Sequence, residues 1–168
     1  MSRGYGEPHL DRKPLIALVD RANRAMQTDM VRRAHADGHA EVKMAHNAVF
    51  GTLHAEGARA AEMAVRAGIT RQSMGEIVRE MVGLDLLEMQ SDPADRRAKV
   101  VRYSEHGLAV ASDGFRYLGQ LERRFAEEFG EQEYEIARDV LARLVDVLDR
   151  VSAEHEAQIS SSAGGKVG

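Results

Sequence analysis

The stretch AAEMAVRAGITRQSMGEIVR, residues 60–79, decides the fold of this 168-residue chain. It contains two short segments of helical apolar spacing divided by Gly68-Ile69-Thr70, a pattern typical of a helix-turn-helix. Ala64 supplies a small side chain where two helices cross closely. Gly68, four positions later, can take the positive φ that the turn favours. We therefore predict two helices here, with the Thr70 hydroxyl capping the second.

A β-hairpin is predicted directly after the second helix. Residues 86–91 and 99–103 each alternate apolar and polar side chains, as half-buried strands do. The inward-facing side chains are expected to be Leu87, Met89, Val101 and Tyr103. Between the strands, Asp92-Pro93-Ala94-Asp95 supplies a turn, in which we expect Asp92 and Asp95 to support the hairpin. A hairpin in this place makes the fold a winged helix.

Long amphipathic helices flank this lobe. An apolar stripe begins at Leu15 and fades near residue 37, and a second helix is predicted from Met44 to Ala55. After the hairpin, one helix is predicted to start at Ser104, and the last carries a stripe from Ile136 to Val151. Because such stripes are too apolar to leave in water, we expect them to be covered across a homodimer interface. A helix bundle within one chain is the alternative.

These elements together predict one mainly α-helical subunit with a small β-hairpin wing. Its predicted parts are a flexible tail (1–13), a dimerisation helix (14–37), the winged helix-turn-helix lobe (44–104), dimerisation helices (104–156) and a second flexible tail (157–168). The folded subunit would thus occupy residues 14–156.

Composition excludes several classes of protein. The chain has no cysteine, which rules out disulfides, thiolate zinc sites and thiol-based oxidation sensing. It contains neither a secretory signal nor the ~18 consecutive apolar residues of a membrane span, so we expect a cytoplasmic protein with no membrane partner. Residues 1–102 carry 16 basic and 14 acidic side chains, whereas residues 103–168 carry 7 and 13. The net acidity therefore lies in the C-terminal third and does not argue against DNA as a partner.

Two segments carry a resemblance to a known family. DPADRRAKVVRYSEHG, residues 92–107, resembles the wing of MarR-type regulators, and TRQSMGEIVREMVGLDLLE, residues 70–88, is similar to their recognition helix and first wing strand. The resemblance covers residues 44–107 closely. It implies a homodimer whose recognition helices enter successive major grooves of a palindromic double-stranded DNA operator while the wings reach the minor grooves. It also implies a repressor that responds to a small aromatic ligand.

DNA-reading side chains are expected in the first turns of the recognition helix, because these lie closest to base edges. The expected readers are Thr70, Arg71, Gln72, Ser73, Glu76 and Arg79. On the wing, Arg96, Arg97 and Lys99 suit the narrow, electronegative minor groove. The sequence leaves open which of the two arginines enters it. The alternative is that all these side chains form an ordinary solvated surface.

Four side chains are candidates for a ligand pocket, since the first two helices line the cavity in the family that the chain resembles. The candidates are Met26, Met30, His46 and His54. The methionines could equally be core filler. His35 and His39 have the spacing of a helical metal site, but Gly38 between them weakens the helix that would orient them. We therefore expect no metal and no cofactor.

Motifs of enzymes are absent from the sequence. It has no G-x-S-x-G, no phosphate-binding glycine loop and no H-E-x-x-H. We therefore expect a DNA-binding transcriptional regulator and not an enzyme. The competing interpretation is a winged helix that docks another protein, in which Arg96 and Arg97 are merely surface charges.

Overall fold

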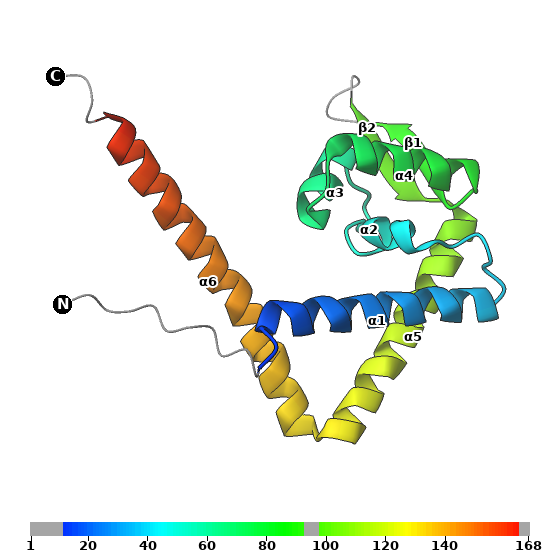
Figure 1. Cartoon of the computed structure of the whole chain (residues 1–168). Helices are drawn as coiled ribbons and strands as arrows, with labels where there is room; N and C mark the ends of the chain where they lie inside the picture. The colour runs from blue at the N-terminus through cyan, green and yellow to red at the C-terminus, as the bar shows by residue number, and fades with distance from the viewer. Residues whose placement is uncertain (1–11, 93–97, 165–168) are drawn as a thin grey trace, which may run out of the picture. The chain divides into compact units, whose positions relative to one another are not determined.

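The computed structural model describes residues 12–92 and 98–164. It is mainly helical with one antiparallel hairpin, as predicted (Figure 1). In chain order the elements are α1 (Leu15–Ala36), the 3₁₀ helix η1 (Met44–His46), α2 (Asn47–Phe50), α3 (Ala60–Ala67), α4 (Arg71–Gly83), β1 (Leu87–Ser91), β2 (Lys99–Tyr103), α5 (Glu105–Phe129) and α6 (Glu131–Gly164). The chain divides into two compact units between Leu118 and Gly119, within α5. Residues 1–11 of the predicted N-terminal tail lie outside the described residues.

Helices α3 and α4 form the predicted helix-turn-helix. Ala64 is 1% exposed at their crossing, and Gly68 ends α3 with φ 66°. The next amide, on Ile69, donates to the carbonyl of Ala64 at 3.1 Å, which closes the turn. Thr70 caps α4 by accepting a hydrogen bond from the amide of Ser73 at 3.1 Å. The capping and the left-handed glycine are therefore confirmed.

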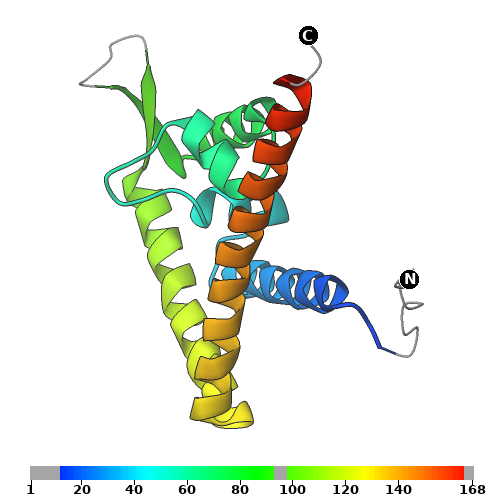
Figure 2. The same ribbon diagram turned by 90° about the vertical axis from the view of Figure 1, so that its left-hand side faces the viewer.

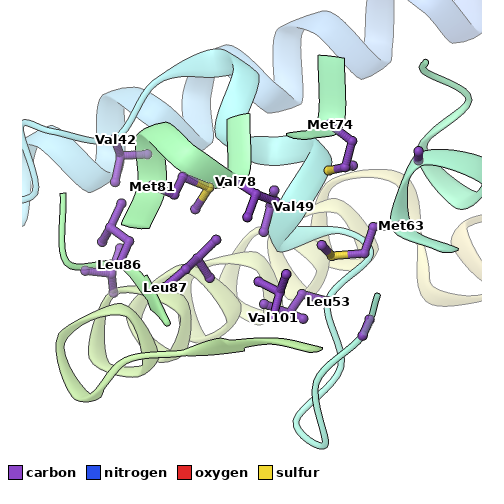
Figure 3. Close-up of a cluster of buried hydrophobic side chains, with 13 residues drawn as sticks. Val42, Val49, Leu53, Met63, Met74, Val78, Met81, Leu86, Leu87 and Val101 are labelled. Atoms are coloured by element: carbon purple, nitrogen blue, oxygen red, sulfur yellow. The ribbon is translucent and has the colours of Figure 1, made fainter. Parts of the chain in front are cut away.

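One apolar cluster holds the lobe together. Side chains from α2, α3, α4 and both strands converge in it, as Figure 3 shows. Val49, Met63, Met74 and Val101 have no exposed surface. Burying a side chain of this size contributes about 1.5–3 kcal/mol, so this cluster fixes how α4 is presented.

The hairpin pairs β1 with β2 in the register Leu87↔Tyr103. Ala58 pairs with the other edge of β2: Ala58 and Val101 exchange two backbone hydrogen bonds, at 3.1 and 2.9 Å. Leu87 and Val101 are buried as predicted, but Met89 is 46% exposed. The inward placement of Met89 is wrong. Its cross-strand partner Val101 is buried and also pairs with Ala58, whereas Met89 on β1 is not covered. Figure 2 shows the hairpin extending away from the helices of the lobe.

The second predicted helix is shorter than expected. It begins as η1 and ends with α2 at Phe50, well before Ala55. Thr52 explains the stop, because its hydroxyl donates to the carbonyl of Ala48 at 2.6 Å while its own carbonyl accepts from Arg66 at 3.0 Å. The chain then turns toward β2, and Gly57 with φ 91° fits only without a side chain: a Cβ there would lie 2.8 Å from the carbonyl oxygen of Val101.

The start of α5 is fixed against the end of α4. Ser104 caps α5 as predicted, since its hydroxyl accepts a hydrogen bond from the amide of Gly107 at 2.9 Å. Gly107 was not singled out from the sequence. A Cβ at this position would lie 1.7 Å from the carbonyl oxygen of Leu86, so the helix can approach the backbone here only because the residue is glycine.

The last two helices are separated by Gly130, which has φ 94°. α6 runs to Gly164, past the end predicted at residue 156. Its described apolar side chains are largely uncovered: Ile136, Val145 and Leu148 are each 55% exposed. No helix in the described ranges 12–92 and 98–164 is long and apolar enough to cross a membrane.

Candidate nucleic-acid interface and ligand cavity

Helix α4 has one buried face and one polar face. Met74, Val78 and Met81 are buried in the core. The exposed face carries the side chains predicted to read DNA: Arg71, Gln72, Ser73, Glu76 and Arg79. Thr70 caps α4 directly before this face, so the polar side chains lie in the first turns of the helix. They do not pack in the core and can contact a partner.

The polar side chains of this face bond to one another. The Gln72 amide donates to a Glu76 carboxylate oxygen at 3.2 Å, and the hydroxyls of Thr70 and Ser73 lie 2.8 Å apart. Arg71 is exposed in the same turn. A guanidinium can bridge the O6 and N7 atoms of guanine, and a side-chain amide can pair with adenine. The face thus has the chemical groups for base recognition.

Gly75 lies within the same part of α4. A Cβ at this position would find only the flexible end of Arg79, at 3.6 Å. Packing inside the lobe therefore does not require a glycine there. Because glycine has no side chain, another molecule can approach the backbone of α4 more closely at this position.

The base of the wing is anchored to the helix-turn-helix. Asp92, predicted to support the wing, is 8% exposed and accepts a hydrogen bond from Nε of Arg59 at 2.9 Å. Arg59 precedes α3, and no sequence signal marked it. Lys99 is exposed on β2, and its ammonium donates to the Ser91 hydroxyl at 3.2 Å. The remaining predicted wing residues, Asp95, Arg96 and Arg97, lie outside the described residues.

A cavity of about 350 Å³ lies between α1, α2 and α5 in the first unit. Met26 and Met30 line it, as the sequence suggested for a ligand pocket. Asn23, Gln27 and Asn47 are its polar side chains, and the remaining wall is apolar. A volume of this size is at the lower end of the range for small-molecule pockets.

The cavity wall also reaches the wing. Phe50 lines the cavity and stacks on Tyr103, the last residue of β2, with the ring centroids 6.2 Å apart and the planes at 12°. Burial raises the pKa of Tyr103 to about 12, so this ring remains a neutral phenol. One aromatic pair therefore separates the cavity from the hairpin.

The two histidines predicted to line the pocket lie elsewhere. His46 is fully buried beside α4, where its Nδ1 accepts from the backbone amide of Lys43 at 3.2 Å and its Nε2 lies 3.9 Å from a carboxylate oxygen of Glu80. Burial lowers the pKa of His46, so the ring is neutral near pH 7. His54 is exposed in the turn after α2. Neither histidine lines the cavity between α1, α2 and α5, and because α2 ends at Phe50 the two residues do not share one helical face.

Other histidines take structural partners. His35 Nε2 lies 2.7 Å from the carbonyl of Val42, and His39 Nε2 lies 3.2 Å from Asp113. Within the described part of the chain, no three metal-ligating side chains gather in a group that could hold an ion.

The comparisons with known proteins agree with this architecture. Residues 44–98 match the family model described as MarR family. The crystal structure of MarR has 22% identity and a TM-score of 0.70, over 87% of this chain and 99% of that one. The transcriptional repressor CouR, solved on a 23-mer DNA duplex, has 21% identity and a TM-score of 0.64, over 79% of this chain and 92% of that one.

A third solved structure is similar to a comparable extent. The PcaV regulator from Streptomyces coelicolor, in complex with its natural ligand, has 23% identity and a TM-score of 0.59, over 79% of this chain and 89% of that one. No curated protein sequence matches the chain. The structures establish the fold, and the family model matches the part of the lobe that runs from η1 through α3 and α4 to β1. Residues 44–98 therefore match the MarR family model, and the chain as a whole shares the fold of solved proteins that include MarR.

Proposed function

We propose that the chain is a homodimeric repressor that binds a palindromic operator in double-stranded DNA and responds to a small molecule. The observation that carries the proposal is the polar face of α4, which begins at the Thr70 cap and lies opposite the core. The fold's likeness to CouR, which was solved on a DNA duplex, supports the same use of this face.

The proposed division of labour follows the chemistry of each element. Arg71 and Gln72 lie in the first turn of α4, where they would contact base edges in the major groove. Lys99 and the predicted wing arginines, Arg96 and Arg97, would contact the minor groove and phosphates, which supplies affinity more than base discrimination. Asp92 would hold the wing in place through Arg59.

Dimerisation is proposed to use the apolar side chains of α6. They recur over most of this helix and are exposed, as in Val140 at 50% and Leu148 at 55%. A second copy of the chain could cover such a stripe, and two-fold symmetry would then present two recognition helices about 34–36 Å apart, one turn of DNA.

Regulation is proposed to start in the cavity between α1, α2 and α5. A molecule bound against Phe50 would press on the ring that stacks on Tyr103 at the end of β2. A ligand with different affinity for the DNA-competent and DNA-incompetent arrangements would shift the balance between them.

The test is fluorescence anisotropy on the DNA upstream of the chain's own gene. We expect wild type to bind one inverted repeat, and Gln72→Ala to lose about 1–3 kcal/mol for each bidentate contact together with preference at one base pair per half-site. Gln120→Ala, an exposed glutamine on α5, is the matched control and should bind as wild type does. If wild type binds no DNA better than a scrambled duplex, the lobe is a protein-docking module instead.

A further inference from the structure

The wall of the cavity between α1, α2 and α5 contains no charged side chain and no histidine. Its polar groups are the three amides of Asn23, Gln27 and Asn47. The rest is aliphatic, aromatic or thioether surface, with Met30 and Phe115 as its larger members. This description applies to the wall as formed by the described residues of one chain.

A group of paired charged side chains lies next to this wall, around a small second cavity that shares Met30 and Gly114 with it. Arg33 donates from Nε to Asp37 at 2.7 Å and lies over the ring of Tyr117. His39 lies 3.2 Å from Asp113, and the hydrogen bond between them lowers the pKa of that carboxyl group, which is therefore an anion at neutral pH. Arg116 also pairs with Asp113, at 2.8 Å, so each arginine of this cluster already has a carboxylate partner and is not available to an anion in the cavity.

The energetics follow from this arrangement. An ionised carboxylate that leaves water needs a cation or several hydrogen-bond donors, and its burial is otherwise strongly unfavourable. A neutral group needs one or two hydrogen bonds, which the three amides can donate or accept. The apolar wall with Met26 and Met30 favours flat rings, because thioether sulfur packs well against aromatic edges.

We propose that this cavity selects a neutral, mainly apolar ring compound with one hydrogen-bonding group, and discriminates against the carboxylate of the same skeleton. The proposal rests on the proposed function, in which the cavity is the effector site. It adds the chemical class of the effector, which the likeness to other regulators does not fix.

The experiment compares amide and acid on a common skeleton with the full-length chain. Binding of benzamide, benzoate, 2-naphthamide and 2-naphthoate is measured at neutral pH by calorimetry, and their effect on operator affinity by anisotropy. We expect each bound amide to be at least about tenfold tighter than its acid, the difference expected when a charge is desolvated without a partner.

Two variants locate the binding. Gly114 lies on the wall, and a Cβ there would meet only the end of Met30, at 3.7 Å, so Gly114→Leu should fill the cavity and abolish binding. Gly119→Leu, on the same helix, is the matched control outside the wall and should bind as wild type does. Gln27→Lys adds a cation to the wall and should reverse the preference toward the acid, whereas Gln27→Met should not.

The possible failures are distinct. If the acids bind as tightly as the amides and Gly114→Leu abolishes both, the cavity is an effector site but the proposed ligand class is wrong. If no compound binds, or if binding persists in Gly114→Leu, both this proposal and the effector role of the cavity are overturned. DNA binding by wild type is unaffected by either result.

Discussion

Arg59 and Asp92 join the start of the helix-turn-helix to the base of the wing, with 2.9 Å between Arg59 Nε and a carboxylate oxygen of Asp92. Asp92 is 8% exposed, and its amide also closes the hairpin by donating to the carbonyl of Ala98 at 3.1 Å. Charge-assisted hydrogen bonds of this kind are stronger than neutral ones. The wing is therefore tied to the rest of the lobe by a side chain as well as by the strands.

Asp92→Ala should lower the free energy of unfolding by about 1–2 kcal/mol. The expected loss is modest because Arg59 is partly exposed and solvent screens the ion pair. Operator affinity should fall as well, since the wing loses its anchor. Urea unfolding and anisotropy measure the two effects. In a double-mutant cycle with Arg59→Ala, the second substitution should add little to the first. Full additivity would show that the pair does not act as a unit.

Gly107→Ala should be among the most damaging substitutions in the chain. The added Cβ would lie 1.7 Å from the backbone oxygen of Leu86, which cannot move without shifting the end of α4. We expect a loss of about 3 kcal/mol or more by thermal or urea unfolding. Gly114→Ala on the same helix is the control, because its Cβ makes an ordinary contact and should raise stability by about 0.5–1 kcal/mol. Equal effects of the two substitutions would contradict the close approach.

His46 should make stability depend on pH. Burial is the main cause and lowers its pKa; Glu80 opposes burial, and Lys43 lowers the pKa further by a smaller amount. Above the usual histidine pKa of about 6.5 the ring is neutral in both states and this stability is fully present. As pH falls below that value the unfolded chain binds the proton first, so stability is lost until the folded-state pKa is passed.

The measurement is urea unfolding at about pH 7.5 and about pH 5.5, on either side of the usual histidine pKa. His46→Asn keeps an acceptor for the Lys43 amide but cannot titrate, so its loss of stability between the two pH values should be smaller than in wild type. The exposed His54→Asn is the control and should behave as wild type does. An unchanged pH dependence in His46→Asn would show that other groups are responsible.

Leu148→Asp should dissociate the proposed dimer. The side chain is 55% exposed in the single chain, so the substitution leaves the monomer's own packing intact but places a charge in the interface. Sedimentation should give a species heavier than 18.5 kDa for wild type and one of 18.5 kDa for the variant. Asp146→Ala on the same helix serves as control. A wild-type chain that sediments as a monomer at micromolar concentration would refute the dimer.

The wing arginines should contribute affinity without sequence preference. Arg96→Ala/Arg97→Ala should weaken operator and scrambled DNA alike and flatten the slope of log affinity against log salt by about one unit per wing. Salt titrations check this, with the exposed α5 pair Arg123→Ala/Arg124→Ala as control. Loss of affinity for the operator alone, at unchanged slope, would mean that the wing reads bases directly.

The elements were predictable wherever local chemistry determines them. The Thr70 cap, the left-handed Gly68, the hairpin and the Ser104 cap each depend on residues within a few positions of one another. The amphipathic face of α4 follows from helical spacing in the same way, although its contacts with DNA remain predictions. The second helix was predicted to be too long for a different reason. The carbonyl of Thr52 accepts a hydrogen bond from Arg66 on another helix, a contact that local sequence does not indicate.

The parts that the sequence did not predict depend on long-range contacts. Nothing near Gly107 indicates that the carbonyl of Leu86 packs against it, and nothing near Arg59 indicates Asp92 as its partner. The same holds for the cavity: the methionines were expected there, but its amide groups and the exclusion of His46 follow from how three helices meet. The absence of catalysis remains a sequence-based expectation.

A single residue, Ser104, stands between the last strand and α5, and its hydroxyl is bonded both to the backbone of Asp85 and to that of Gly107. The connection is one residue long and is hydrogen-bonded on both sides. We therefore expect the wing and the first turns of α5 to move as one rigid body. Val110 and Ala111, about one turn further along α5, line the cavity, so one short stretch of α5 joins the cavity wall to the end of the wing.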